Sequence, residues 1–449
     1  MRYLLTTFIC AFFLLVSPAQ SLLRFVGTSA VTTRIGVTDA AFNANHVAIE
    51  QQTQDFMYNG HEKPVIIPVV FHVLFTDSVN VTAEQINCQL QSLNEDFSGL
   101  TFKIQSNLDL TTSFYDSLTL AGRMSMFSRA SSNTNISFCL AQTNDLGQPT
   151  TGVEYLYVPA KTWTWDDGMK KQQSSGLKAW DGQRYLNIWV CQMADSVSCY
   201  AQMPGGPWET DGIVIDHRFF GCGSTVASVK APFNKGKTLT HLIGNYLNLY
   251  DLWSYYFRCQ DDNVSDTPVH NAPTFGCDHY RHISTCDGQP DAMTMNFMDN
   301  SDDACLYMFT NGQVTRMQAV LAENGWRSGL TKAISDGLSC SVAPLTDAIL
   351  PEKFWQKDPE TTAKKGVIAL NVDPNPAHET ITVSMVSTDE ARGWLRLTNA
   401  TGKEMYKRKQ TLSKGVTTVE INCSTWTPGV YFVVLTTNGK PYSRMVIVN

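Results

Sequence analysis

The segment KTLTHLIGNYLNLYDLW, from Lys237 to Trp253, decides how the rest of the chain is interpreted. Apolar residues recur along it at helical spacing, which predicts a buried amphipathic helix. These residues are Leu239, Leu242, Ile243, Tyr246, Leu247 and Tyr250. One histidine, His241, lies within this face. A lone histidine in such a helix is usually structural, so the segment by itself predicts a helix and leaves its chemistry open.

The same histidine begins an incomplete zinc-binding pattern. In the sequence H-E-x-x-H-x-x-G-x-x-H, three imidazoles bind one zinc ion and the glutamate activates the bound water. The five defining positions here hold His241, Leu242, Asn245, Asn248 and Asp251. Leucine accepts no proton, and an amide is a poor replacement for imidazole on zinc. Asparagine in place of glycine still tolerates a left-handed backbone.

Several separate segments resemble, in the same order, the pappalysin family of metzincin metalloproteases. The resemblance extends over residues 24–325 and implies a metzincin-like zincin domain of the α/β (α+β) class. Besides the helix, the matching segments are IPVVFHVLF (67–75), YAQMPGG (200–206), TDGIVI (210–215), CQDDNVSDTPVHNAPTFGC (259–277) and MTMNFMDNSDDACLYMFTNGQVTRMQAVL (293–321).

The resemblance assigns a role to each position of the site. The three zinc-binding positions fall on His241, Asn245 and Asp251, and the general-base glutamate falls on Leu242. The methionine of the Met-turn falls on Met298. With one of three zinc histidines present, the ancestral zinc is not expected to bind.

Two further positions depart from the family pattern. A tyrosine near the metal is replaced by Asn300, and the cysteine that holds the zinc latent in the pro-segment is replaced by Val26 in RFVGTS. No residue of the chain is therefore expected to be catalytic.

These losses predict a secreted pappalysin-like homologue that does not cleave peptides. We expect it to bind a peptide or protein partner, such as a protease or an inhibitor, through a cleft along an exposed sheet edge. A scaffold without any binding role is the simpler alternative. A carbohydrate- or surface-binding module is a further alternative, although the sequence contains no distinctive feature for it.

An active zinc metalloendopeptidase with an atypical metal site is the principal alternative. In that case Asp251 and a second histidine would bind zinc, and Asp299 is a candidate base. The candidate histidines are His217, His270, His279 and His282.

The N-terminus predicts export. Arg2 precedes an apolar run, Leu4–Val16, and small residues follow it, which is typical of a signal peptide over residues 1–19. The run is shorter than the roughly 20 residues of a membrane-spanning helix, and no later segment is long and apolar enough. The net charge of −7, without a dense basic patch, argues against a nucleic-acid partner.

In an exported chain, cysteines more often form disulfides than bind metal. Of the 12 cysteines, Cys10 lies in the signal peptide, so 11 remain and at least one thiol is unpaired. The resemblance implies two interleaved pairs, Cys259 with Cys286 and Cys277 with Cys305.

The loop QDDNVSDTP, residues 260–268, is rich in the oxygen ligands that calcium prefers. The resemblance implies a calcium site in this region, with Asp262, Asp266 and Thr267 as candidates. An acidic loop that is merely solvated is the alternative.

The chain divides into regions of different composition. Residues 20–60 form a polar, pro-segment-like region with a helix-like patch, and 61–336 the pappalysin-like domain. Strands are predicted over 63–75, 135–142, 184–193 and 210–220, and a helix capped by Thr82 and Gln85 over 82–97. Residues 337–366 are charged and patternless, as linkers are.

Residues 367–449 contain short alternating runs separated by turns, which predicts a small all-β sandwich. The segments DPNPAHETITV, TNATGKEMYK and TPGVYFVVLTTNGKPYSRMVIV resemble the C-terminal sorting domains of type IX secretion cargo. The resemblance implies a bacterial protein that the type IX machinery carries to the cell surface or releases.

Overall fold

The computed structural model of the chain consists of two compact units, residues 1–350 and 351–449. The described residues are 24–58, 64–76, 81–102, 133–158, 161–194, 197–223, 231–253, 258–277, 286, 292–345, 367–373, 377–387, 390–399, 403–427, 429–437 and 440–448. The predicted signal peptide lies outside them.

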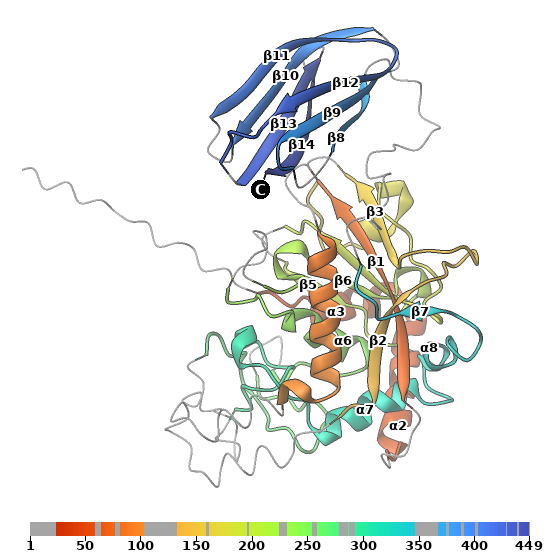
Figure 1. Ribbon diagram of the computed structural model, residues 1–449. Helices are drawn as coiled ribbons and strands as arrows, with labels where there is room; N and C mark the ends of the chain where they lie inside the picture. The colour runs from red at the N-terminus through yellow and green to blue at the C-terminus, as the bar shows by residue number, and fades with distance from the viewer. Residues whose placement is uncertain are drawn as a thin grey trace, which may run out of the picture. The chain divides into compact units, whose positions relative to one another are not determined.

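A seven-stranded sheet forms the centre of the first unit, with β1 in its middle (Figure 1). The strand order is β5-β6-β4-β1-β2-β7, and β3 pairs with the second half of β1. The bounds are β1 (Val65–Phe75), β2 (Ile136–Ala141), β3 (Val153–Tyr157), β4 (Leu186–Cys191), β5 (Cys199–Ala201), β6 (Ile213–Asp216) and β7 (Cys340–Ser341). The inner strands are parallel, whereas β5 and β7 run antiparallel at the two edges. Because β1 is β-branched, aromatic and buried along almost its whole length, it suits a central parallel strand.

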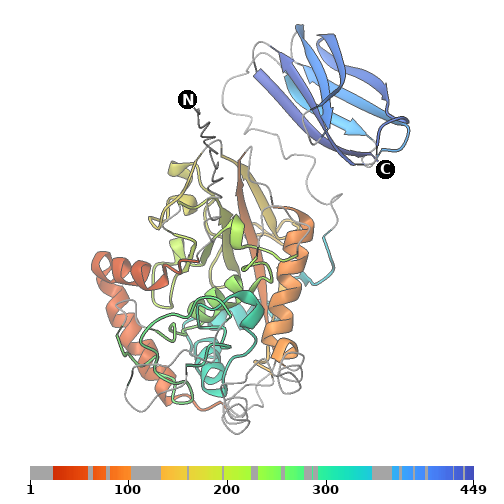
Figure 2. The same cartoon turned by 90° about the vertical axis from the view of Figure 1, so that its left-hand side faces the viewer.

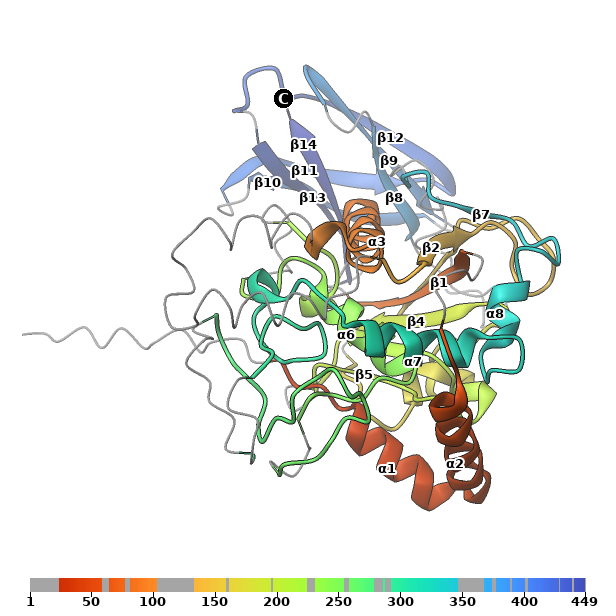
Figure 3. The ribbon, with the colours of Figure 1, turned by 90° about the horizontal axis from the view of Figure 1, so that it is seen from below.

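Helices lie on both sides of this sheet. Figures 2 and 3 show α1 and α2 on one side and α3 on the other. The bounds are α1 (Thr28–Thr38), α2 (Ala40–Asp55), α3 (Ala83–Phe97), α6 (Lys237–Tyr246), α7 (Asn311–Leu321) and α8 (Ser328–Lys332). Short 3₁₀ turns occur at Gly168–Lys170, Gln172–Ser174, Trp208–Thr210, His217–Phe219 and Asp303–Cys305. No described helix is long and apolar enough to cross a bilayer.

The predicted strands and helices of the first unit occur, and α1, β3, β5, β7, α7 and α8 are present in addition. The capping box of α3 forms as expected: Thr82 Oγ1 accepts the Gln85 N–H, and Gln85 Oε1 accepts the Thr82 N–H. The pro-segment-like region contains two helices, whereas the sequence indicated a helix-like patch only over the second of them. Asp39, between the two helices, caps α2 by accepting the Ala41 N–H.

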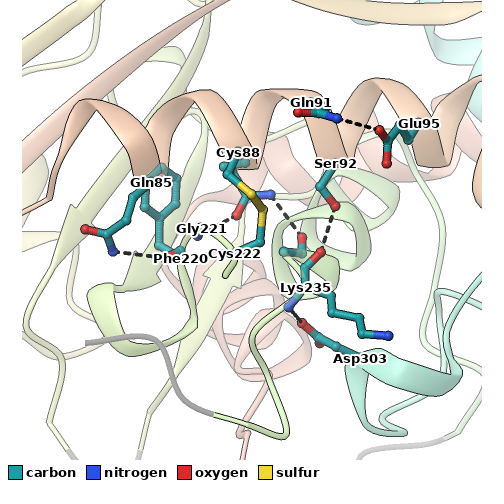
Figure 4. Close-up of a disulfide and its surroundings, with 12 residues drawn as sticks. Gln85, Cys88, Gln91, Ser92, Glu95, Phe220, Gly221, Cys222, Lys235 and Asp303 are labelled. Carbon is teal, nitrogen blue, oxygen red and sulfur yellow. Dashed lines mark hydrogen bonds between the residues drawn. A yellow bond between two sulfur atoms is a disulfide. The ribbon is translucent and has the colours of Figure 1, made fainter. Parts of the chain in front are cut away.

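Four disulfides occur among the described residues of the first unit, and the two pairs that the resemblance implies are among them. The pairs are Cys88–Cys222, Cys139–Cys340, Cys259–Cys286 and Cys277–Cys305. Figure 4 shows the Cys88–Cys222 bond, which ties α3 to the segment that leads from β6 to α6. In the part of the chain that the structure describes, three buried cysteines are unpaired: Cys191, Cys199 and Cys423.

The second unit is a β-sandwich of a four-stranded sheet, β11-β10-β13-β14, and a three-stranded sheet, β12-β9-β8. The bounds are β8 (Val367–Asp373), β9 (Thr380–Ser387), β10 (Ala391–Asn399), β11 (Glu404–Leu412), β12 (Gly415–Asn422), β13 (Gly429–Thr437) and β14 (Lys440–Val448). Alternate residues of β10, such as Leu395 and Leu397, are buried in a common apolar core. This arrangement is the predicted all-β sandwich.

Candidate functional site

The helix α6 carries the former zinc motif and is buried throughout. It packs against α3, β5 and β6, and Figure 3 shows it close to β5. Met298 lies directly beneath it, since a Cβ added at Gly244 would be 2.4 Å from the Met298 sulfur. The Met298 carbonyl accepts the Leu252 N–H. Met298 therefore packs against α6 at Gly244, and only glycine allows so close an approach.

His241 uses both ring nitrogens in hydrogen bonds to acceptors. Its Nδ1 lies 2.8 Å from the Phe297 carbonyl oxygen, and its Nε2 lies 2.9 Å from Asp251 Oδ1. The His241 side chain is fully buried. Both ring nitrogens thus lie within hydrogen-bond distance of protein oxygens, and one of these oxygens belongs to the carboxylate at another former zinc position.

Asn245 is oriented by an unbroken chain of hydrogen bonds. Its Nδ2 donates to the Leu249 carbonyl at 3.1 Å and to Asp251 Oδ1 at 3.0 Å. Its Oδ1 accepts the Thr28 hydroxyl at 2.9 Å, and Thr28 Oγ1 in turn accepts the Ala201 N–H at 3.1 Å. Because the Ala201 amide can only donate, the direction of every bond in the chain follows.

Asn248 makes the turn that glycine makes in the zinc motif. Its φ of +74° is in the left-handed region, where asparagine is tolerated best after glycine. Its side-chain amide donates to Glu50 and Thr53 of α2. The substitution therefore keeps the bend and adds an attachment point for the N-terminal region.

The three zinc-binding positions lie together but do not fit zinc. One imidazole is bonded at both nitrogens, and the asparagine presents its N–H groups to Asp251. Catalytic zinc needs three protein ligands with free lone pairs, and here one carboxylate accepts bonds from the two neighbouring side chains. Leu242, in the base position, is fully buried and apolar.

The sheet edge beside this site is already paired with the chain's own N-terminal segment. Val26 forms a parallel bridge with Cys199 of β5, and Gly27 N–H donates to the Cys199 carbonyl at 2.7 Å. The Phe25 carbonyl accepts the Ser198 and Cys199 N–H groups. The expectation of an exposed edge is therefore wrong for this conformation, because residues 25–27 occupy it.

Arg24 anchors the front of this segment. Its side chain is fully buried and forms an ion pair with Asp303, with 3.4 Å between Nη1 and Oδ1. It also donates to Asn300 Oδ1 and the Ser301 carbonyl, and it lies over the Phe233 ring. Burial raises the pKa of the Asp303 carboxyl, and the Arg24 guanidinium opposes that rise. Asn300, in the family's tyrosine position, thus positions Arg24.

The helices that follow are anchored separately. Glu50 of α2 lies 2.5 Å from the guanidinium of Arg316 on α7, and the Arg316 side chain is buried. Arg34 of α1 forms an ion pair with Asp167. Asn45 donates to the Gly205 carbonyl at 3.0 Å. Polar contacts thus hold residues 24–55 to the domain along their whole length.

The residues of the alternative, active-enzyme interpretation have other partners. Asp299 accepts the Thr274 N–H and the Ser301 hydroxyl. His270 Nε2 accepts the Met293 N–H at 2.8 Å. His217 follows β6 directly, with Nε2 3.9 Å from Asp216 Oδ1. His279 and His282 lie outside the described residues.

The calcium candidates divide into two places. Asp262 Oδ1 accepts the Thr267 hydroxyl and the Val264 N–H. Asp266 accepts the Thr310 hydroxyl and the Gly312 N–H, and thereby holds the first turn of α7. Asp262 Oδ2 is buried and has no partner within the described residues, so this oxygen is where a cation would bind. A calcium site remains a prediction.

Arg24, Thr28 and Asp303 connect the N-terminal segment to the site and were not among the residues predicted from the sequence. One signal was available, because Arg24 interrupts an apolar run of leucine, phenylalanine and valine. A cation in such a run needs a buried partner. Nothing local indicated that the partner is 279 residues away.

We predict that the purified protein contains no stoichiometric zinc, because both His241 nitrogens are engaged. The double substitution Asn245→His with Asp251→His should create a three-imidazole set and raise the zinc content towards one per chain. The measurement is elemental mass spectrometry after dialysis, with the further His241→Ala change as the control that removes the gained zinc. Near-stoichiometric zinc in the unmodified protein would contradict the prediction.

Burial raises the pKa of Asp262 to about 7, and Thr267 and the Val264 N–H oppose that rise. The folded-state pKa exceeds the unfolded value of about 3.9. At pH values between these two pKa values, the folded state therefore binds more protons than the unfolded state. The free energy of unfolding should therefore fall as the pH rises from 5 to 7, by up to about 1.4 kcal/mol per pH unit, and level off above pH 7. Denaturant titrations at both pH values should show a smaller fall for Asp262→Asn.

If Asp262 also binds calcium, added CaCl₂ should raise the melting temperature at pH 8. The rise should be absent in Asp262→Asn. An equal rise in both proteins would assign calcium to another place.

Comparison with known proteins supports the family resemblance that the sequence segments show. Residues 170–322 match the family described as pregnancy-associated plasma protein-A, and residues 371–449 match the secretion system C-terminal sorting domain. Promirolysin of Tannerella forsythia has a similar structure, with a TM-score of 0.58 and 30% identity, covering 70% of this chain and 99% of that one. Mature mirolysin of Tannerella forsythia in complex with a cleaved peptide has a TM-score of 0.52 and 32% identity. This match covers 61% of this chain and 98% of that one.

Curated relatives are extracellular metalloproteases of fungi. One from Arthroderma otae is 35% identical over 39% of this chain and 67% of its own length. Another from the same organism is 29% identical over 34% of this chain, which spans 61% of that relative. The C-terminal unit is a type IX sorting domain, so the protein is exported to the cell surface or beyond it. The chain belongs to the pappalysin family of metalloproteases.

Proposed function

We propose that this exported protein does not hydrolyse peptide bonds and instead binds an extended peptide segment of a partner protein along β5. One observation carries the proposal: β5 already holds an extended segment by backbone hydrogen bonds, beside a motif whose residues bond to one another. A protease, a protease inhibitor or another surface protein could supply such a segment.

Binding at a strand edge does not need a metal. The affinity comes from main-chain N–H and C=O groups, and neighbouring side-chain subsites supply selectivity. Residues 25–27 form such main-chain hydrogen bonds with the backbone groups of Ser198 and Cys199. A partner segment of similar shape would make the same bonds, so the loss of Glu and His at Leu242 and Asn245 leaves this mode of binding intact.

The resident segment would compete with any partner. A short tether keeps such a segment at an effective concentration in the millimolar range. Its displacement also separates Arg24 from Asp303, and an unpaired buried charge costs several kcal/mol. A partner must therefore replace these bonds. Thr28, the first residue of α1, leaves with the segment, whereas the later part of α1 and α2 remain in place because Arg34 and Glu50 hold them independently.

We predict no hydrolysis of denatured protein substrates, since Leu242 cannot accept a proton and general base catalysis contributes about 100-fold or more. Mass spectrometry of substrate incubated with the purified protein is the measurement. New cleavage products that disappear both with a chelator and with His241→Ala would contradict the proposal. The His241→Ala protein excludes a contaminating protease as their source.

Weakening the resident segment should open β5 to a peptide added in solution. A fluorescent peptide with the sequence of residues 24–29, RFVGTS, should bind the full-length Arg24→Ala protein at least tenfold more tightly than the unmodified protein, by fluorescence anisotropy. The arginine of the peptide would restore the partner of Asp303. Arg392→Ala, at an exposed position of β10, is the matched control. Equal weak binding to all three proteins would contradict groove binding.

A further inference from the structure

The former zinc position Asn245 presents a hydrogen-bond acceptor to the groove, and the neighbouring Ala201 N–H presents a donor. We infer that Asn245 and the Ala201 N–H form a subsite that selects a hydroxyl group. The groove would therefore take an extended peptide with threonine or serine at the place that Thr28 occupies. The part that concerns partner peptides rests on the proposed function, whereas the subsite itself does not.

Thr28 occupies this subsite in a closed environment. The residue is 2% exposed, and its Oγ1 lies 2.9 Å from Asn245 Oδ1 and 3.1 Å from the Ala201 nitrogen. Asn245 is buried as well. Water therefore does not compete for these bonds. A side chain without a hydroxyl at this place would leave Asn245 Oδ1 and the Ala201 N–H without a hydrogen-bond partner.

Only a group that both donates and accepts satisfies the subsite. The Ala201 N–H requires an acceptor, and Asn245 Oδ1 requires a donor, because the Asn245 N–H groups are used by Leu249 and Asp251. A hydroxyl meets both requirements with one atom. Valine has the shape of threonine but would leave two buried polar groups unpaired, and a site that bonds a hydroxyl discriminates strongly against an analogue without it.

The selectivity originates in this chain's own departure from the zinc motif. An acceptor oxygen faces Thr28 because the position holds asparagine, and Asp251 fixes the direction of the amide by accepting from Nδ2 at 3.0 Å. The two substitutions that remove zinc ligands thus build the subsite together.

The first experiment measures the subsite in the intact protein by a double-mutant cycle. Thr28→Ser should preserve the folding equilibrium constant, whereas Thr28→Val should lower it about tenfold. In an Asn245→Leu background, the difference between threonine and valine at position 28 should largely disappear. Chemical denaturation monitored by fluorescence gives each equilibrium constant.

Thr33 provides the matched control on α1, since its hydroxyl donates to the Ser29 carbonyl on the exposed helix surface. Thr33→Val should have a smaller effect than Thr28→Val. The inference is overturned if the two valine substitutions have equal effects, or if the full cost of Thr28→Val persists without Asn245.

The second experiment separates the subsite from the proposed function. Full-length Arg24→Ala protein is titrated with RFVGTS and with peptides that carry serine or valine in place of its threonine. The two hydroxyl peptides should bind at least tenfold more tightly than the valine peptide, and Asn245→Leu should remove that preference. Equal binding of all three would overturn the inference and leave groove binding standing. If no peptide binds but the double-mutant cycle shows coupling between Thr28 and Asn245, groove binding is overturned and the subsite serves Thr28 alone.

Discussion

The carboxylate of Asp303 connects the parts on which the site depends. It accepts the N–H groups of Lys235 and Lys237, where α6 begins, and it pairs with the guanidinium of Arg24. Figure 4 shows the bond from Lys235. Asp303 itself follows Met298 in the chain by five residues, so the helix, the Met-turn and the N-terminal segment share one buried charge. Because an unpaired buried charge is costly, each part stabilises the position of the others.

The N-terminal segment also solves a problem of sheet architecture. An edge strand such as β5 exposes unpaired backbone groups that can pair with other chains. Residues 25–27 cover those groups on Ser198 and Cys199, and Phe25, which is 57% exposed, marks where the segment meets solvent. The same pairing that limits access to the groove therefore keeps the exported protein from associating through this edge.

Local patterns predicted much of the fold. The capping box at Thr82, the buried strand β1 and the left-handed turn at Asn248 follow from propensity and from the conformational range of each residue type. The resemblance supplied the position of Met298 and two disulfide pairs. The closed groove was not predictable, because Arg24 and Thr28 find partners more than 200 residues away. No short-range pattern specifies such pairings, and the sequence of the segment reads equally well as a removable pro-segment.

The hydrogen-bond network around Asp251 makes the loss of the zinc motif hard to reverse in evolution. Replacing Asn245 alone would take partners from Asp251, Leu249 and Thr28, and replacing Asp251 alone would leave His241 and Asn245 unmatched. Each single step back towards three imidazoles passes through a protein with buried polar groups lacking partners, before any metal offsets the cost. Selection for stability alone therefore opposes each single substitution that would restore a zinc-binding histidine, and the network makes the loss of the motif effectively one-way.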